Sequence, residues 1–395
     1  MSRRLKVLMA MPFSPVPPDF GGALRVYHLL KQVARRHQVT VLTYGSPEDA
    51  GRIRSEFDLP QVRVVAPTWK AASRRAGQLY STFTRHSFFQ QSVTGGAFQR
   101  ELDALLKEEP FDVVQTEFSH LGPFSLKTHA LKVLDTHNVE YDNFRRMFES
   151  SGWGLKKLHY GLEFQKMKAD ELAWCRLQDA VLTTSARDKA LFGQDLTLPI
   201  HVVPNGMDGD YFAPRADVQP EEHTLVFTGM MAYVPNHDGI TWFLDEVLPL
   251  IARKVPKVKL YVVGKNPPEA ITRRASESVV VTGTVPDVRP YVWRSSVYVV
   301  PLRMGGGTRL KVAEALSMQK PMVTTRIGCE GIDLKDGESA LMADAPQEFA
   351  DAVVRLLGDA ALRRRLAENG ATVARQKYDW NVIGQTLEEI YQRER

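Results

Sequence analysis

Cysteine is scarce in this chain of 395 residues, because Cys175 and Cys329 are the only two and they lie far apart in the sequence. This excludes a disulfide framework, and it leaves no CxxC motif for a zinc site or a redox centre. We expect two free, buried thiols in a protein of a reducing compartment, with a bridge between them as the alternative.

Long hydrophobic runs are missing as well, since no apolar run approaches the roughly 18 residues of a membrane-spanning helix. The first residues, MSRRLKVLMAMPFSP, place basic side chains before an apolar stretch, as a signal peptide does, but the apolar core at 7–11 is too short for one. We interpret this core as a buried strand and expect a cytoplasmic protein. The hydrophobic (44%), charged (25%) and aromatic (9%) fractions are ordinary for a soluble globular chain, and the length predicts two or three domains.

Acidic residues are absent between Asp58 and Glu101, although the net charge of the whole chain is only +5. Basic and aromatic side chains are interleaved in this gap, residues 59–100. One interpretation is a surface that touches anionic lipid headgroups or a lipid-diphosphate-linked sugar, and the alternative is a solvated helix face above buried aromatics. Nucleic acid fits less well, because no recognised motif accompanies the charge.

Short runs of Val, Ile and Leu alternate with amphipathic stretches of helical period along almost the whole chain. Most runs are continuous rather than alternating, which is typical of strands buried on both faces. Strand–helix alternation predicts parallel sheets with crossover helices. The predicted strands are 7–11, 39–44, 62–66, 113–116, 131–135, 180–184, 201–203, 225–228, 260–263, 279–282, 297–301, 322–325 and 340–342, with helices at 23–36, 236–253 and 309–318 among others.

The segment VPNGMDGDYFAPRADVQPEEH (203–223) is rich in Pro, Gly and Asp, shows no period, and separates two α/β series of similar size. We interpret it as a linker between two doubly wound domains, 1–204 and 205–377. The carboxyl ends of their strands are expected to face a central cleft, where open α/β sheets bind ligands.

Glycines precede predicted helices in both halves, at Gly21–Gly22 and in the run GGGTRLK that begins at Gly305. Glycines at a helix N-terminus let an anion approach free N–H groups, and the alternative for the first pair is a turn that needs positive φ. In the second half Gly306 and Gly307 lead to Thr308, which we predict to be the N-cap.

Arg309 and Lys311 follow in the predicted first turn, where the helix dipole disfavours cations. We therefore predict a bound polyanion, and the alternative is a surface basic pair with no partner. Glu314, on the same helix, could accept bonds from a pair of ribose hydroxyls or could be merely solvated. His137 falls just beyond a predicted strand end, where it could bond a sugar hydroxyl or polarise a reacting oxygen, or serve as a structural hydrogen-bonder.

These features together resemble the GT4-type glycosyltransferases, a retaining, nucleotide-sugar-dependent family of GT-B architecture, which means two Rossmann-like domains. The resemblance covers nearly the whole chain in order. It is carried by PPDFGGALRVYHLL, DTHNVEYDNF, VLTTSARDKALF, VVPNGMDGDYF, LVFTGMMAYVPNHDGITWF, LYVVGKNP, VVVTGTVPDVRPYV, VVPLRMGGGTRLKVAEALSMQKPMVTT and GCEGIDLKDGESALM.

The resemblance implies a role for each matching residue near the donor. Gly21 and Gly22 match the loop whose amides face the donor diphosphate. His137 matches the histidine that contacts the donor sugar, and Glu314 matches the second glutamate of an E-x7-E motif, which holds the ribose.

The resemblance also implies a nucleobase region at Gly264 and at TGTVPDV, which contains Gly283 and Val285. The C-terminal helix, within 378–395, would pack back on the first domain. No metal or other cofactor is implied, since the sequence indicates no carboxylate pair or His/Asp cluster and GT-B enzymes generally work without one.

Two departures from the family pattern stand out. The first glutamate of E-x7-E would fall at Gly306, and the stretch GMMAYVPNHDG lacks the Arg and Lys that commonly clamp the diphosphate. We expect Arg309 and Lys311 to supply those two charges and to stabilise the departing nucleoside diphosphate.

The predicted function is a retaining transfer of sugar from a nucleoside-diphosphate sugar to a glycan or lipid-linked acceptor, in surface or extracellular polysaccharide synthesis. Two alternatives are a nucleotide-sugar epimerase, which would need more acid/base groups than His137, and a non-catalytic nucleotide-sugar-binding partner. An NAD dehydrogenase is disfavoured, because no GxGxxG follows the first strand.

Overall fold

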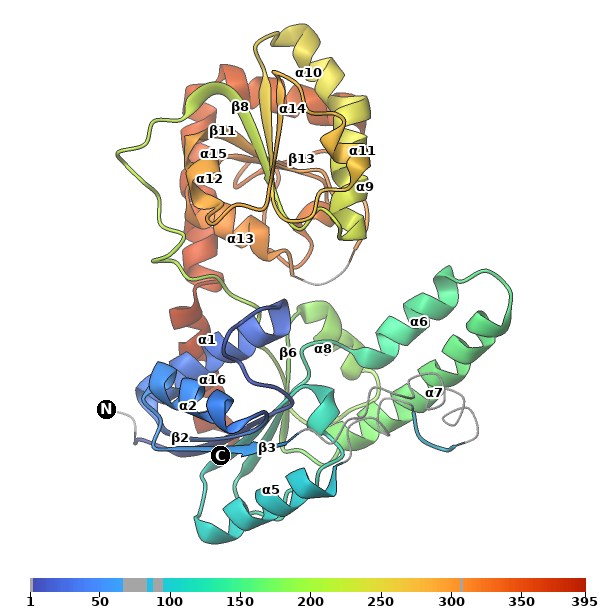
Figure 1. Cartoon of the computed structure of the whole chain (residues 1–395), viewed down its shortest axis with the longest axis vertical. Coiled ribbons are helices and arrows are strands. Elements are labelled where there is room, and N and C mark those ends of the chain that lie inside the picture. The colour runs from blue at the N-terminus through green and yellow to red at the C-terminus, as the bar shows by residue number, and fades with distance from the viewer. Residues whose placement is uncertain (1–2, 67–83, 88–94, 306–307) are drawn as a thin grey trace. The chain divides into compact units, whose positions relative to one another are not determined.

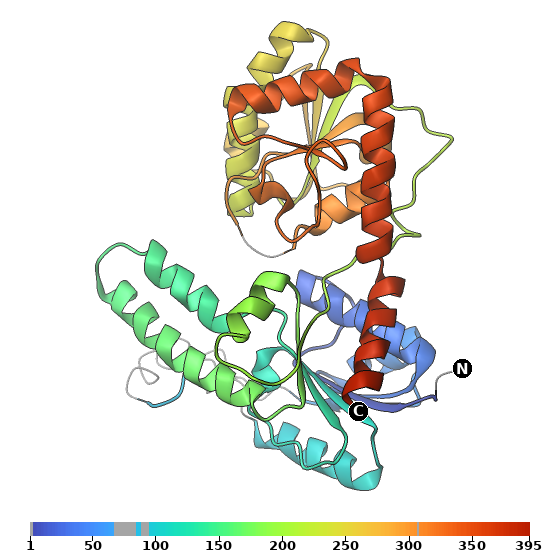
Figure 2. The same cartoon turned by 180° about the vertical axis from the view of Figure 1, so that it is seen from behind.

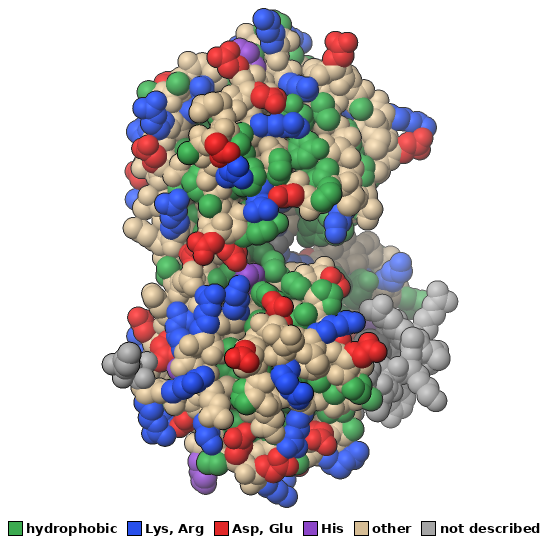
Figure 3. Space-filling view, turned by 60° about the vertical axis from the view of Figure 1, so that its left-hand side comes forward, with side chains coloured by type: hydrophobic (Ala, Val, Ile, Leu, Met, Phe, Trp, Pro, Cys, Tyr) green, Lys and Arg blue, Asp and Glu red, His purple; other side chains and the backbone are tan. Residues whose placement is uncertain are grey.

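The computed structural model describes residues 3–66, 84–87, 95–305 and 308–395. The chain divides into two units: unit 1 is Met1–Pro204 with Gly384–Arg395, and unit 2 is Asn205–Ile383. Each unit holds one parallel sheet covered by helices (Figure 1). On the face drawn in Figure 3, Lys and Arg are interspersed with Asp and Glu over both units, so the small positive net charge does not gather there.

The sheet of unit 1 has seven strands in the order β3-β2-β1-β4-β5-β6-β7, and every neighbouring pair is parallel. Its central strands are mostly apolar at their start and buried along nearly their whole length, as helices on both faces require. The strands are β1 (Lys6–Met11), β2 (Gln38–Tyr44), β3 (Gln61–Val65), β4 (Val113–Glu117), β5 (Leu131–Asp135), β6 (Ala180–Thr183) and β7 (Ile200–Val202).

Helices connect these strands, and one further helix of this unit comes from the far end of the sequence. From Gly384 onward α16 belongs to unit 1, where the buried Tyr391 donates a hydrogen bond to Gln115 of β4. The helices of unit 1 are α1 (Gly21–Arg36), α2 (Pro47–Phe57), α5 (Gly96–Glu108), η2 (Ser119–Leu121), α6 (Glu140–Ser150), α7 (Leu155–Cys175), α8 (Ala186–Phe192) and α16 (Trp380–Glu394).

The sheet of unit 2 has six parallel strands in the order β10-β9-β8-β11-β12-β13. One continuous hydrophobic core fills the space between this sheet and its helices. The strands are β8 (Glu221–Thr228), β9 (Lys259–Val263), β10 (Val279–Gly283), β11 (Ser295–Val300), β12 (Met322–Thr324) and β13 (Leu341–Met342).

The helices of unit 2 differ from prediction in one place, because the helix expected over 236–253 is interrupted by a π-helical turn. Pro249 lies just after that turn, and a proline has no N–H to continue the α-helical ladder. The elements are α9 (Val234–Trp242), the π-helix η3 (Phe243–Val247), α10 (Leu248–Lys254), α11 (Glu269–Thr272), α12 (Arg289–Arg294), α13 (Leu310–Ser317), η4 (Ile327–Cys329), α14 (Pro346–Gly358) and α15 (Ala360–Lys377).

The predicted fold class is confirmed, since both sheets are parallel and every predicted strand is present. β8 begins at Glu221, four residues earlier than expected, because its polar start pairs with the first residue of β11. Both cysteines are free and buried, as predicted. Among the described helices, none combines the length and the apolar character that crossing a membrane demands. Most of the acid-free segment 59–100 lies outside the described residues.

Candidate functional site

The strand order of each sheet reverses direction once, between β1 and β4 in unit 1 and between β8 and β11 in unit 2. In open α/β sheets, ligands bind outside the carboxyl ends of the strands at such a switch point. The loops that leave these strands therefore define one candidate site in each unit.

Lys311, in the first turn of α13, reaches the end of β8 in unit 2. Its Nζ donates to the Thr228 carbonyl at 2.8 Å and to Asn236 Oδ1 at 2.7 Å. Burial lowers its pKa to about 7. Gly229, at φ +154°, allows this approach, because a Cβ there would lie 2.8 Å from the Lys311 ammonium. The ammonium group of Lys311, predicted from the sequence to bind a polyanion, therefore lies at the end of β8, next to the switch point.

Gly264 follows β9 beside the same turn. A Cβ on it would lie 1.7 Å from the Gly229 carbonyl oxygen, so close packing of two loops accounts for this glycine. Gly283, at the end of β10, has φ +68° and open space around it, so its backbone conformation favours glycine. Val285 packs against the core of unit 2. Gly283 ends β10 and Val285 follows it, and this edge strand lies beyond β9, so the two residues are not gathered with Lys311.

Arg309 lies at the N-cap position of α13, so the prediction that Thr308 caps this helix is wrong. The Thr308 hydroxyl is buried and has no hydrogen-bond partner among the described residues. Arg309 is buried, and its Nε donates to the Ile327 carbonyl at 3.3 Å. Burial lowers its pKa. Gly306 and Gly307, predicted to cradle a phosphate, lie outside the described residues.

Glu314 lies one turn after Lys311 on α13 and is partly exposed. In the described part of the chain, no residue forms a hydrogen bond with its carboxylate, and burial raises its pKa to about 7. Arg309, Lys311 and Glu314 therefore come together at the β8–β11 switch point, two cations and a carboxylate with capacity to bind a ligand.

In unit 1, Gly21 and Gly22 are the first two residues of α1, not residues that precede it. Neither has a positive φ, so a strained turn does not account for them. A Cβ on Gly22 would lie 2.5 Å from Phe118 Cζ, whereas one on Gly21 would meet open space. Gly22 thus makes room for an aromatic ring at the end of β4.

His137 stacks on this Phe118 ring, with centroids 3.6 Å apart and an interplanar angle of 24°. Both residues have left-handed backbone conformations, with φ +58° at His137 and +68° at Phe118. Non-glycine residues adopt this region at an energetic cost, and such strain clusters at functional sites.

Glu117, the last residue of β4, anchors the imidazole. Its Oε2 lies 2.8 Å from His137 Nε2, and its Oε1 accepts a hydrogen bond from Gln115 Nε2 at 2.6 Å. Tyr391 of α16 in turn donates to Gln115. A buried polar chain from α16 to the histidine therefore fixes the orientation of the ring.

Asp135, the last residue of β5, pairs with Glu117 in the register of the sheet and lies 3.7 Å from the same His137 nitrogen. Ligand atoms of these three side chains lie within 4.8 Å of one another, so the sequence-based expectation of no His/Asp cluster is wrong. Arg25 of α1 binds both Asp135 oxygens, at 2.9 and 3.1 Å. Since a guanidinium already neutralises Asp135, we interpret the cluster as an ion-pair and proton-sharing network.

Burial decides where the proton between Glu117 and His137 resides. It lowers the pKa of His137 to about 3, so the ring is neutral, and it raises the pKa of Glu117 to about 7. Nearby His120 is neutral for the same reason, with a pKa lowered to about 4. Below pH 7, protonated Glu117 therefore donates its proton to a hydrogen bond with Nε2. The single proton of the neutral ring is then on Nδ1.

We expect the tautomer of His137 to change near pH 7. Below this pH, protonated Glu117 donates to Nε2 and Nδ1 bears the ring proton; above it, ionised Glu117 accepts from Nε2–H and Nδ1 becomes an acceptor. Imidazole ¹⁵N shifts of histidine-labelled protein measure this directly. Glu117→Gln should abolish the change, and a wild-type tautomer that stays constant from about pH 5 to 9 would contradict the assignment.

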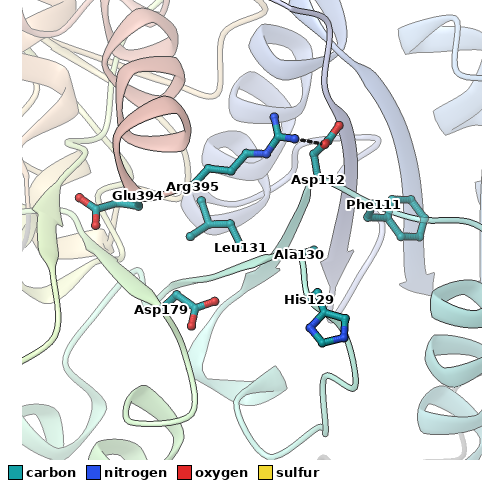
Figure 4. Close-up of a pocket in the computed structure, with 8 residues that line it drawn as sticks. All are labelled: Phe111, Asp112, His129, Ala130, Leu131, Asp179, Glu394 and Arg395. Carbon is teal, nitrogen blue, oxygen red and sulfur yellow. Dashed lines mark hydrogen bonds and ion pairs between the residues drawn. The ribbon is translucent and has the colours of Figure 1, made fainter.

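A cavity of about 310 Å³ lies elsewhere in unit 1, at the amino ends of β4, β5 and β6. Figure 4 shows Arg395 at its rim, paired with Asp112 just before β4. Because ligands of such sheets bind at the carboxyl ends, we assign this cavity no part in the candidate site.

Two family models and several known proteins are similar to this chain. A family model described as Glycosyltransferase Family 4 matches residues 21–211, and one described as Glycosyl transferases group 1 matches residues 222–359. An uncharacterized 44.6 kDa protein in the cps region of Klebsiella pneumoniae is 21% identical over 95% of this chain and 96% of its own length.

Two further proteins are similar to the chain. The phosphatidyl-myo-inositol mannosyltransferase of Mycobacterium leprae is 29% identical, over 48% of this chain and 52% of its own length, so the match spans about half of that relative. The crystal structure of Anabaena Alr3699/HepE in complex with UDP has a TM-score of 0.69 at 14% identity, covering 98% of this chain and 100% of that one. Its likeness shows a shared GT-B fold.

Proposed function

This chain belongs to the glycosyltransferases of family 4 and group 1, and from that premise we propose that it transfers a sugar from a nucleoside-diphosphate sugar to a glycan or lipid-linked acceptor with retention of configuration. We further propose a role in surface or extracellular polysaccharide synthesis. The observation that carries the proposal is the group formed by Arg309, Lys311 and Glu314 at the β8–β11 switch point.

The donor half of this proposal uses the charges of unit 2. Negative charge develops on the diphosphate oxygen as the sugar departs, and cations already held in place stabilise it without reorganisation. Arg309 and Lys311 are so held, by the Ile327 carbonyl and by Thr228 and Asn236. Glu314 accepts the ribose hydroxyls. With two cations present, the reaction proceeds without a metal cofactor.

The sugar-positioning half uses unit 1. His137, oriented by Glu117, bonds the donor sugar, while the amides of Gly21 and Gly22 at the start of α1 face the diphosphate. The incoming hydroxyl gives its proton to the departing phosphate. The acceptor lies against unit 1, and the basic segment 59–100 contacts anionic lipid headgroups.

One observation favours a second candidate, a non-catalytic nucleotide-sugar-binding partner. The stretch GMMAYVPNHDG after β8 carries Tyr233, Asn236 and His237 but no Arg or Lys, where the family commonly has both, and Gly306 stands where the family has a glutamate. Release of nucleoside diphosphate that depends on an acceptor would support the enzyme, and donor binding without turnover would support the partner.

A thermal-shift panel of UDP, GDP, ADP, dTDP and their common sugars tests donor binding. A ligand at about 100 times its Kd adds about 2.7 kcal/mol to the free energy of unfolding, so the true donor produces a clear rise in Tm. We place uridine nucleotides first, because a structural neighbour is in complex with UDP. A response to none of them, or to NAD alone, would refute the proposed diphosphate site.

Glu314→Gln is the matched variant for this panel. It keeps the volume of the side chain but removes the charge that binds two hydroxyls, so the Tm rise with the selected nucleotide should shrink. Glu368→Gln, on the exposed side of α15, serves as the control. If Glu314→Gln responds like the control, the ribose contact is wrong.

A further inference from the structure

Helices α6 and α7 form a hairpin that extends away from the sheet of unit 1 in both views (Figures 1 and 2). Its two helices pack on each other, with Gly161 against the Phe148 ring. The hairpin joins the core of unit 1 only at its base, through Tyr141 at the start of α6 and through Met167, Leu172 and Trp174 in the second half of α7. The outer part, residues 145–162, which we name the hairpin tip, contributes no side chain to that core.

Large apolar side chains are exposed on this hairpin tip. Trp153 is 96% exposed in the loop between the helices, and Leu155 is 87% exposed at the start of α7. Leu158 and Leu162 follow at helical spacing, at 62% and 40%, so the three leucines line one face. Met147 adds a fifth exposed apolar side chain. Scattered apolar residues are normal on a surface, but a continuous set of this size indicates a binding surface.

Cations surround these apolar side chains. The hairpin tip contains Arg145, Arg146, Lys156 and Lys157 against the single acid Glu149, a net charge of +3. Arg145 and Arg146 bind Asp142 at the start of α6, so the charge offered to a partner comes mainly from Lys156 and Lys157. Lys157 Nζ lies 5.1 Å from the centroid of the Trp153 ring, so charge and aromatic surface are presented together.

From this combination we infer that the hairpin tip inserts into the headgroup region of an anionic membrane surface. Trp and Leu bury their apolar parts at the boundary of the acyl chains, while Lys and Arg contact lipid phosphates. A second copy of this chain fits less well, because Lys is depleted in the centre of protein–protein interfaces. The surface lies outside both candidate sites and outside the segment 59–100, so the inference goes beyond the proposed function and needs no donor.

Vesicle co-sedimentation tests this inference on the full chain. Wild-type protein should bind vesicles of phosphatidylcholine with phosphatidylglycerol more strongly than phosphatidylcholine alone, and salt should weaken the binding. The double variant Trp153→Ser/Leu155→Ser should partition about tenfold less, given the apolar area removed. Leu177→Ser, also an exposed leucine of unit 1, should bind like wild type.

Lys156→Glu/Lys157→Glu gives a second variant in which only charge changes, and its preference for anionic vesicles should weaken, while any contribution of the segment 59–100 stays the same in all variants. Wild-type protein that ignores anionic vesicles, or a Trp153→Ser/Leu155→Ser variant that binds them unchanged, would overturn the inference. Light scattering that shows a dimer dissociated by the same double variant would also overturn it, in favour of a second copy. The Tm rise with nucleotide should be equal in all these variants, so a failed donor site is recognised separately.

Discussion

Arg309→Ala is expected to lower kcat by about 100-fold or more with little change in KM. Arg309 is buried at the start of α13, and its orientation is set by the Ile327 carbonyl. A positive group held in this way costs no reorganisation when negative charge develops on the leaving diphosphate, and losing one preorganised group of this kind costs about 10²- to 10³-fold. Steady-state kinetics with the donor found in the nucleotide panel measure the effect.

Two companion variants make this result specific. Arg309→Lys keeps the charge but loses the planar guanidinium, so it should recover part of the rate. Arg364→Ala, on the exposed face of α15, should match wild type. An Arg309→Ala effect confined to KM would show that Arg309 binds donor and transition state equally, and the assigned role would be wrong.

The fold could be predicted because its evidence is local. Most strands contain a run of Val, Ile or Leu, and burial on both faces of a parallel sheet favours that pattern whatever the loops do. The closeness of Arg309, Lys311 and Glu314 also follows from local sequence, since Lys311 and Glu314 lie on α13 and Arg309 is its N-cap residue. The helix interruption near Pro249 and the N-cap position of Arg309 were not predicted, because the ends of helices depend on individual hydrogen bonds.

The network around His137 could not be predicted in the same way. Glu117 and Asp135 meet because β4 and β5 pair in one particular register, and Arg25 comes from a helix 110 residues away from Asp135. The available signal was a charged residue at the end of two apolar strands, which sheet geometry places at one edge. Nothing in the sequence indicated why Gly22 and Gly264 must be glycines, since each packs against a residue that is distant in the sequence.

His137→Asn is expected to lower kcat/KM by about 100-fold, with a modest fall in Tm from the lost buried contacts. Asparagine is chosen because His137 has φ +58°, a conformation that asparagine tolerates and alanine does not, so backbone strain does not confuse the result. The variant loses the ring that stacks on Phe118 and the nitrogen that Glu117 orients. If His137 bonds the donor sugar, the preorganised contact is lost in the transition state.

The choice of ligand then separates this role from a structural one. His137→Asn should reduce the Tm rise given by the nucleotide sugar but not the rise given by the nucleoside diphosphate alone, since only the sugar contact is removed. His129→Asn, at the amino ends of the strands and so on the side of the sheet away from His137, should behave as wild type in both assays. Activity of His137→Asn within about threefold of wild type, a difference of less than 1 kcal/mol, would show that the buried network serves the fold of unit 1 and not the reaction.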